Sequence, residues 1–285
     1  MAAKPWHLDN GIQDNDSLKL RSKDMRASTP SPVSTASQSS DSSTLSLHEP
    51  LARSNYPHGS KSLSGISIRA FLLGVTLGVS SILTCVLLFS HPCWRAPFFL
   101  SSLSLFHFLE YYLTARYNTP YANISAFLLS RNGRAYNAAH TGAFLECIIA
   151  SFLVPKWQHQ FSNVYTIPLG LILMAVGQIT RSSAMAQAGT NFNHTVQTKR
   201  NEGHVLVTTG VYSWLRHPSY FGFFWWGLGT QLVLGNFFCF LIYTFVLWSF
   251  FRNRIRREES LLIEFFGKQY EAYSGRTTVG IPFIT

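Results

Sequence analysis

The last third of the chain holds a polar run whose residue types and spacing suit the binding of a small molecule. Arg216, His217, Ser219 and Tyr220 surround Pro218, directly before an apolar stretch. Proline is favoured at the first position of a helix, and it pushes the residue before it into an extended conformation. We therefore expect His217 to project at a helix N-terminus. The local pattern favours equally a plain interpretation, in which Arg216 and His217 anchor the chain at a membrane interface.

A second polar group, residues 254–259, carries opposite charges at helical spacing. Arg254 and Glu258 are four residues apart and would share one face of a helix. Glu258 also lies near an apolar stripe formed by Ile255 and Leu262, where a carboxylate is costly unless it is paired or faces a polar cavity. Taken alone, this pattern favours solvated charges on an interfacial helix over an active site.

Two further acidic residues, Glu110 and Glu146, lie inside apolar stretches. Ionisable residues inside a membrane are by default candidates for function. We favour a structural polar contact for both, with His107 or His140, because they lie far before the C-terminal cluster.

Motifs of common soluble enzymes are absent from the sequence. No G-x-G-x-x-G follows a strand pattern, and no Walker lysine loop, G-x-S-x-G elbow or H-E-x-x-H occurs. The cysteines are scattered without a C-x-x-C pair, so we expect buried thiols and no metal site. They are Cys85, Cys93, Cys147 and Cys239.

The composition indicates an integral membrane protein. Of the 285 residues, 47% are hydrophobic and 13% are charged, whereas soluble domains have about 25% charged residues. The net charge of +10 is explained by basic loops on one side of a membrane and by attraction to anionic lipids. The basic residues flank apolar stretches and form no stripe on a soluble fold, which argues against nucleic-acid binding.

The elements that must position these residues are predicted to be all α-helical. Residues 1–64 are rich in Ser, Thr and Pro and predict a disordered extension. Residues 65–285 predict a polytopic membrane domain of about six transmembrane helices, with the catalytic part at about 190–285. Gly235-Asn236 predicts a helical hairpin between the last two runs, which are short and either span or re-enter the membrane. The apolar runs are 70–90, 96–115, 138–154, 164–180, 218–234 and 237–251.

Lys and Arg in the loops predict the orientation. With the N-terminus in the cytosol, every basic cluster falls on the cytosolic side, and both termini are cytosolic. Residues 252–273 predict a separate amphipathic helix at the cytosolic membrane surface, which Gly267 interrupts at a modest cost.

Together, these elements closely resemble the isoprenylcysteine carboxyl methyltransferase family, from about residue 106 to residue 284. The Arg-His-Pro-x-Tyr element alone is moderately specific, because sterol reductases and phospholipid methyltransferases carry similar elements. The combination of Arg-His-Pro-Ser-Tyr with the Glu-Glu and Phe-Phe-Gly elements at this spacing is highly specific for the family. Besides residues 204–220, the matching elements are Phe106-His107, Glu110-Tyr111, Asn191-Phe192-Asn193-His194, Gly229-Thr230-Gln231, Glu258-Glu259, Phe265-Phe266-Gly267, Tyr270 and Ile281-Pro282-Phe283-Ile284.

The resemblance implies methylation of the C-terminal carboxylate of a prenylated cysteine in processed CaaX proteins, with S-adenosylmethionine as methyl donor. It implies a multi-pass protein of the endoplasmic reticulum membrane with a cytosol-facing active site, and clients such as small GTPases and lipidated peptides. Arg254 matches the position that faces the substrate carboxylate, and Arg254 and Glu258 are the expected catalytic pair. The implied cofactor contacts are Gln197, His204, Val205, Leu206, Val207, Tyr212, His217, Pro218, Ser219, Tyr220 and Glu258.

Elementary chemistry agrees with this role. An α-carboxyl group has a pKa of about 3.3–3.7, so the nucleophile is already an anion at neutral pH and needs no general base. A prenyl chain keeps the substrate in the bilayer, whereas the polar cofactor comes from the cytosol. The two can meet only at a site open to both phases.

Two alternative functions share some of these features. A membrane sterol reductase that uses a nicotinamide cofactor would carry a similar C-terminal element, but Glu258-Glu259 and the Phe-Phe-Gly element argue against it. A non-enzymatic scaffold for prenylated tails would not need Arg254 and Glu258 beside a polar loop.

Overall fold

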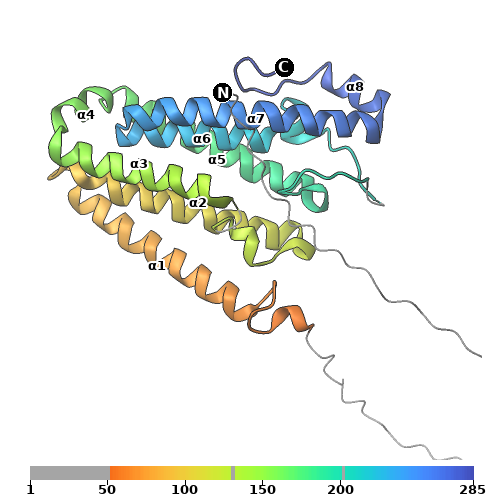
Figure 1. The fold of residues 1–285 in the computed structure, drawn as a ribbon, viewed down its shortest axis with the longest axis horizontal. Helices are drawn as coiled ribbons and strands as arrows, with labels where there is room; N and C mark the ends of the chain where they lie inside the picture. The colour runs from red at the N-terminus through yellow and green to blue at the C-terminus, as the bar shows by residue number, and fades with distance from the viewer. Residues whose placement is uncertain (1–51, 130–131, 201–202) are drawn as a thin grey trace, which may run out of the picture. The chain divides into compact units, whose positions relative to one another are not determined.

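The computed structural model describes residues 52–129, 132–200 and 203–285 (Figure 1). Within these ranges the chain forms α-helices and short 3₁₀ turns, with no strand and one isolated bridge between Leu215 and Thr278. The all-α prediction is therefore confirmed for the described residues. The α-helices are α1 (Leu63–Leu87), α2 (Arg95–Tyr117), α3 (Gly133–Leu153), α4 (Pro155–Phe161), α5 (Thr166–Ala188), α6 (Pro218–Leu234), α7 (Phe237–Phe266) and α8 (Lys268–Ser274).

The predicted disordered extension overlaps little with the described residues, since residues 1–51 lie outside them. Residues 52–64 contain a 3₁₀ turn, Arg53–Asn55, and the start of α1. The Ser62 side chain caps α1 by accepting a hydrogen bond from the Gly65 N–H at 3.1 Å. The helical part therefore begins before the predicted segment 70–90.

Consecutive long helices run in alternating directions, so their ends gather at two levels (Figure 1). At the level of α4, Gln158 Nε2 donates to the Leu234 carbonyl oxygen at 2.9 Å. At the opposite level, Asn118 Nδ2 donates to the Phe192 carbonyl oxygen at 2.8 Å. This second level carries the start of α6 and the end of α7, where the sequence predicts the chemistry.

Paired glycines bring α5 and α6 into direct backbone contact. A Cβ atom added to Gly177 would lie 2.5 Å from the carbonyl oxygen of Gly222, and one added to Gly170 would lie 2.8 Å from that of Gly229. Small residues of this kind let membrane helices approach closely. The contact fixes α6, and with it the first turn of α6, against α5.

The predicted boundary between the run 237–251 and a separate helix 252–273 is wrong. α7 continues unbroken from Phe237 to Phe266 and ends at Gly267, whose φ is +53°. Residues 252–266 contain neither proline nor glycine and are rich in Arg, Glu and Leu, which favour a helix. Charge alone does not end a helix, so α7 carries its polar half as a direct extension of its apolar half. α6 and α7 are joined by two residues, Gly235 and Asn236.

Each of the six apolar runs of the sequence lies wholly or mostly within one helix. Among the described helices, two are long and apolar enough to cross a membrane by length and composition, Leu63–Leu87 and Thr166–Asn191. α1 exposes large apolar side chains, with Phe71 and Ile82 each 65% exposed. An apolar surface of this kind marks contact with lipid or protein.

We predict that Gly177→Ala destabilises the protein, because the new methyl group would meet the backbone of α6. Overpacking of this kind typically costs about 1–3 kcal/mol. Thermal unfolding in detergent should therefore shift to lower temperature. Gly74→Ala on α1 is the matched control, since a Cβ there meets nothing within 4 Å. Equal melting temperatures for the two variants would contradict the α5–α6 contact.

Candidate active site

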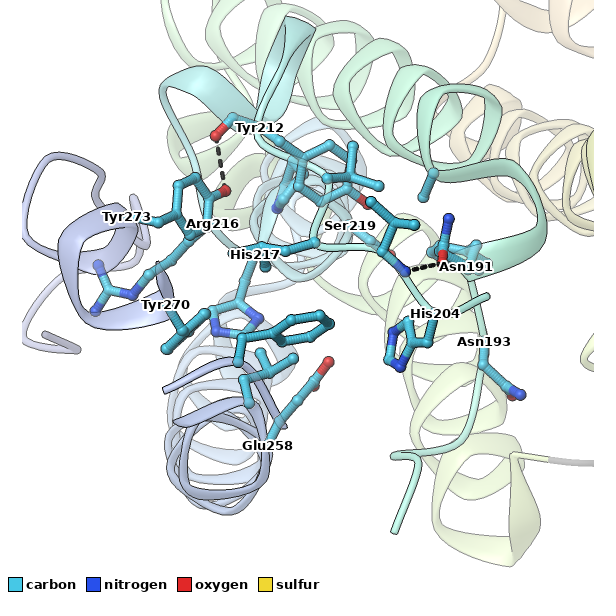
Figure 2. Close-up of a pocket in the computed structure, with 18 of the residues that line it drawn as sticks. Asn191, Asn193, His204, Tyr212, Arg216, His217, Ser219, Glu258, Tyr270 and Tyr273 are labelled. Atoms are coloured by element: carbon cyan, nitrogen blue, oxygen red, sulfur yellow. Dashed lines mark hydrogen bonds between the residues drawn. The ribbon is translucent and has the colours of Figure 1, made fainter. Parts of the chain in front are cut away.

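A pocket lies where α6 begins and α7 ends (Figure 2). Its walls come from the end of α5, the segment that follows residue 203, the first turn of α6, the polar half of α7, and α8. Segments that are far apart in the sequence therefore meet around one cavity. The lining residues are Ala188, Asn191, Phe192, Asn193, His204, Val205, Leu206, Val207, Tyr212, Arg216, His217, Pro218, Ser219, Tyr220, Glu258, Leu262, Phe266, Tyr270 and Tyr273.

The first turn of α6 forms one wall, and Glu259 of α7 holds it. Pro218 is the first residue of the helix, as predicted, and the preceding His217 is 5% exposed. Glu259 Oε1 accepts from Arg216 Nε at 2.6 Å and lies 3.0 Å from His217 Nε2. Burial raises the pKa of Glu259, but the hydrogen bonds from His217 and Arg216 outweigh it and bring the pKa below 4.5. The charged carboxylate can only accept, so it places the His217 proton on Nε2.

The hydroxyl of Tyr220 joins two charged residues of α7. It donates to Glu258 Oε2 at 2.5 Å and accepts from Arg254 Nε at 2.8 Å. Arg254 Nη2 also donates to the His194 carbonyl oxygen at 2.5 Å. The two groups predicted to carry the chemistry therefore lie beside the start of α6, although Arg254 does not line the pocket.

The segment 204–207, which belongs to no helix or strand, forms a second wall. The Val205 N–H donates to Asn191 Oδ1 at 3.0 Å, which fixes this segment against the end of α5. The His204 ring lies 5.4 Å from that of Phe266. Burial, together with the charge of Arg200, lowers the pKa of His204 below 6.5. His204 is therefore neutral at pH 7.

Three tyrosines close the side of the pocket formed by α8. Tyr273 donates its hydroxyl to the Tyr212 carbonyl oxygen at 2.7 Å (Figure 2). Burial raises the pKa of Tyr273 to about 12, and it also raises the pKa values of Tyr212 and Tyr270. All three phenols therefore stay neutral, and they add ring faces to the wall without adding charge.

Most of the predicted cofactor contacts meet in this pocket. Gln197 does not line it, and its Nε2 donates to the Thr195 carbonyl oxygen at 3.5 Å. Several lining residues were missed although they belong to elements that carry the family resemblance, so that resemblance was the available signal. They are Asn191, Phe192, Asn193, Arg216, Phe266 and Tyr270. The predicted residues that line the pocket are His204, Val205, Leu206, Val207, Tyr212, His217, Pro218, Ser219, Tyr220 and Glu258.

Glu110 lies behind the pocket wall and pairs with Arg181 of α5. Arg181 Nη2 donates to Glu110 Oε2 at 2.8 Å, and its Nη1 donates to Ser219 Oγ at 2.7 Å. The contact is buried and structural, as expected, but the expected partners His107 and His140 were wrong. The pair holds Ser219, and with it the first turn of α6, from the side of α2 and α5.

Glu146 makes a different structural contact, at the far end of α7. Its carboxylate oxygens accept from the N–H groups of Phe238 and Cys239 at 2.9 and 2.7 Å. These N–H groups belong to the first turn of the helix and have no acceptor within it, so an acidic side chain there stabilises α7.

Comparisons with known proteins identify the family of this chain. Residues 170–264 match the model of the isoprenylcysteine carboxyl methyltransferase family. The protein-S-isoprenylcysteine O-methyltransferase of Saccharomyces cerevisiae is 47% identical over 225 residues, which cover 78% of this chain and 92% of that protein. The Homo sapiens protein of the same name is 39% identical over 220 residues, which cover 77% of this chain and 75% of that protein.

A solved structure of a eukaryotic intramembrane Ras methyltransferase, an isoprenylcysteine carboxyl methyltransferase, has a similar fold. It aligns with a TM-score of 0.71 and 36% sequence identity over 77% of each chain. The alternative of a sterol reductase has no support from these relatives. On this evidence the chain belongs to the isoprenylcysteine carboxyl methyltransferase family.

Proposed function

We propose that this chain transfers the methyl group of S-adenosylmethionine to the C-terminal carboxylate of a prenylated cysteine. A carboxylate oxygen bonds to the methyl carbon, and the carbon–sulfur bond breaks with its electron pair going to sulfur. The observation that carries the proposal is the placement of Glu258 and Arg254 one turn apart on α7, beside a pocket with aromatic walls. The names of the relatives, protein-S-isoprenylcysteine O-methyltransferases, support the same reaction.

The chemistry of the pocket walls fits S-adenosylmethionine, which supplies the methyl group and a good leaving group when it is bound. The Glu258 carboxylate has the opposite charge to a sulfonium or an ammonium group, and the ring face of Tyr212 attracts cations. The non-helical segment 204–207 has backbone N–H and C=O groups outside any helix, and such groups can pair with the edge of a base. Gln197 remains a predicted contact outside the pocket lining.

Arg254 fits the role of orienting the substrate carboxylate. Its Nε and Nη2 donate within the protein, and no described residue accepts a hydrogen bond from its Nη1. A guanidinium binds a carboxylate with directional, charge-assisted hydrogen bonds. Fixing one oxygen in line with the methyl group lowers the entropic part of the barrier. Because the carboxylate is already charged, no residue need remove a proton.

We infer a membrane arrangement in which the six long helices span or enter the bilayer and the pocket faces the cytosol. The endoplasmic reticulum is the membrane expected for this chemistry. At about 1.5 Å per residue, α7 exceeds the ~30 Å hydrocarbon thickness, so its polar half extends from the membrane. Basic residues at the pocket level, among them Arg116, Arg216 and Arg254, are those expected on the cytosolic side. Prenylated small GTPases and other lipidated peptides are the proposed substrates.

A direct experiment tests the reaction. Membranes that contain the protein are incubated with S-farnesylated cysteine and S-adenosylmethionine labelled at the methyl group. We expect label that remains with the lipid fraction and is released by base as methanol, as an ester requires. Membranes without the protein are the control. Absence of base-labile label, with a preparation that binds the cofactor, would refute the proposed reaction.

Arg254→Ala and Glu258→Gln should separate the two halves of the site. Loss of a hydrogen bond to a charged group costs about 1.5–3 kcal/mol, which is about ten- to a hundredfold. Arg254→Ala should reduce turnover by this factor and leave the dissociation constant of the cofactor nearly unchanged. Glu258→Gln should weaken cofactor binding first. Steady-state kinetics and equilibrium cofactor binding measure both, and equal loss of cofactor affinity in the two variants would contradict these roles.

The lowered pKa of His204 predicts how cofactor binding depends on pH. His204 is neutral above its pKa, and as the pH falls through this value it gains a positive charge in the pocket. That charge repels the cationic groups of S-adenosylmethionine. The KM for the cofactor should therefore rise as the pH falls below 6.5, and His204→Gln should flatten this rise. An unchanged rise in the variant would place the titrating group elsewhere.

A further inference from the structure

Arg254 and Glu258 do not form the ion pair that their positions favour. Opposite charges four residues apart on a helix are neighbours and attract each other. Among the described residues, four ion pairs within 4.0 Å are found, and none joins Arg254 to Glu258. Something in the structure therefore keeps these two side chains apart.

The Tyr220 hydroxyl occupies the position between them. A phenol can donate one hydrogen bond and accept another, and here it donates to Glu258 Oε2 at 2.5 Å and accepts from Arg254 Nε at 2.8 Å. Each charged group thereby has a neutral partner in place of the opposite charge. A hydrogen bond to a neutral hydroxyl leaves the full charge on each side chain, whereas a direct ion pair would cancel both.

The Tyr220 ring is held firmly enough to act as a separator. It stacks on His217 with ring centroids 5.4 Å apart and an interplanar angle of 6°, and on Phe251 at 5.2 Å and 26°. The Arg254 guanidinium carbon lies 5.3 Å from the centre of the same ring. Arg254 is drawn away from Glu258 as well, because its Nη2 donates to the His194 carbonyl oxygen at 2.5 Å.

We propose that Tyr220 is a positioning residue whose hydroxyl prevents Arg254 and Glu258 from neutralising each other. The inference rests on the proposed function, which needs both charges at once. Arg254 keeps its positive charge for the substrate carboxylate, and Glu258 keeps its negative charge for the cationic methyl donor. The hydroxyl thus serves both substrates while it removes no proton from either.

The test begins with Tyr220→Phe, which keeps the ring and removes the hydroxyl. Arg254 and Glu258 then pair directly, so the KM values for the prenylated substrate and for the cofactor should both rise, each by about tenfold. The same two KM values are measured for Tyr220→Leu, which also removes the hydroxyl and should raise both. The result then does not depend on whether one variant is produced as folded protein. Tyr243→Phe is the control, because it removes a buried hydroxyl that lies 2.8 Å from His140 Nδ1, and it should change neither KM.

The decisive step adds Glu258→Gln to Tyr220→Phe. Removing the negative charge frees Arg254, so the KM for the prenylated substrate should return to within a few-fold of the parent value, while that for the cofactor stays high. A hydroxyl that only packs or only binds the cofactor would give no such rescue. Failure of the rescue, or a rise in the cofactor KM alone, would overturn the inference. Failure of the parent protein to form the ester would instead refute the proposed function.

Discussion

The first turn of α6 is held by charged side chains from two other helices, and the pocket is built against it. Arg181 of α5 donates to Ser219, Glu259 of α7 lies against His217, and Glu258 of α7 accepts from Tyr220. Two residues of this turn, and His217 directly before it, are therefore fixed by bonds from outside α6. Pro218 favours the start of the helix at this residue, and the charged partners fix the orientation of the first turn relative to α5 and α7.

These charged contacts fix geometry more than they add stability. Moving two charges out of water costs about as much as their attraction returns, but removing one partner leaves the other buried and uncompensated. Glu110 is 1% exposed and Arg181 is 7% exposed, and the two bind each other through paired hydrogen bonds. Through Arg181, the site is thus connected to Glu110 of α2. This residue is distant in sequence from the C-terminal segment that supplies most of the walls of the pocket. The glycine contact between α5 and α6 makes the connection possible, because it brings Arg181 within reach of Ser219.

Local patterns in the sequence predicted much of this structure. Apolar runs identified the long helices, Pro218 identified the start of α6, and the helical spacing of Arg254 and Glu258 placed both on α7. The length of α7 was not predicted, because its charges suggested a new interfacial element, although no residue before Gly267 breaks the helix. Tyr273 could not be placed in the pocket from its own surroundings, since α8 must first fold against residue 212. The partner of Glu110 likewise depends on packing between distant helices.

The continuity of α7 also fixes the position of Arg254 along the helix axis. Because a single helix runs from Phe237 through Arg254, the Cα atom of Arg254 lies about 26 Å along the axis from the start of α7 at ~1.5 Å per residue. A lipid tail fixes the depth of its own carboxylate in the same way, by the length of chain that it buries. The proposed reaction therefore requires that the position of Arg254 along α7 match the depth at which the lipid tail holds the substrate carboxylate. The thickness of the bilayer determines whether the two match.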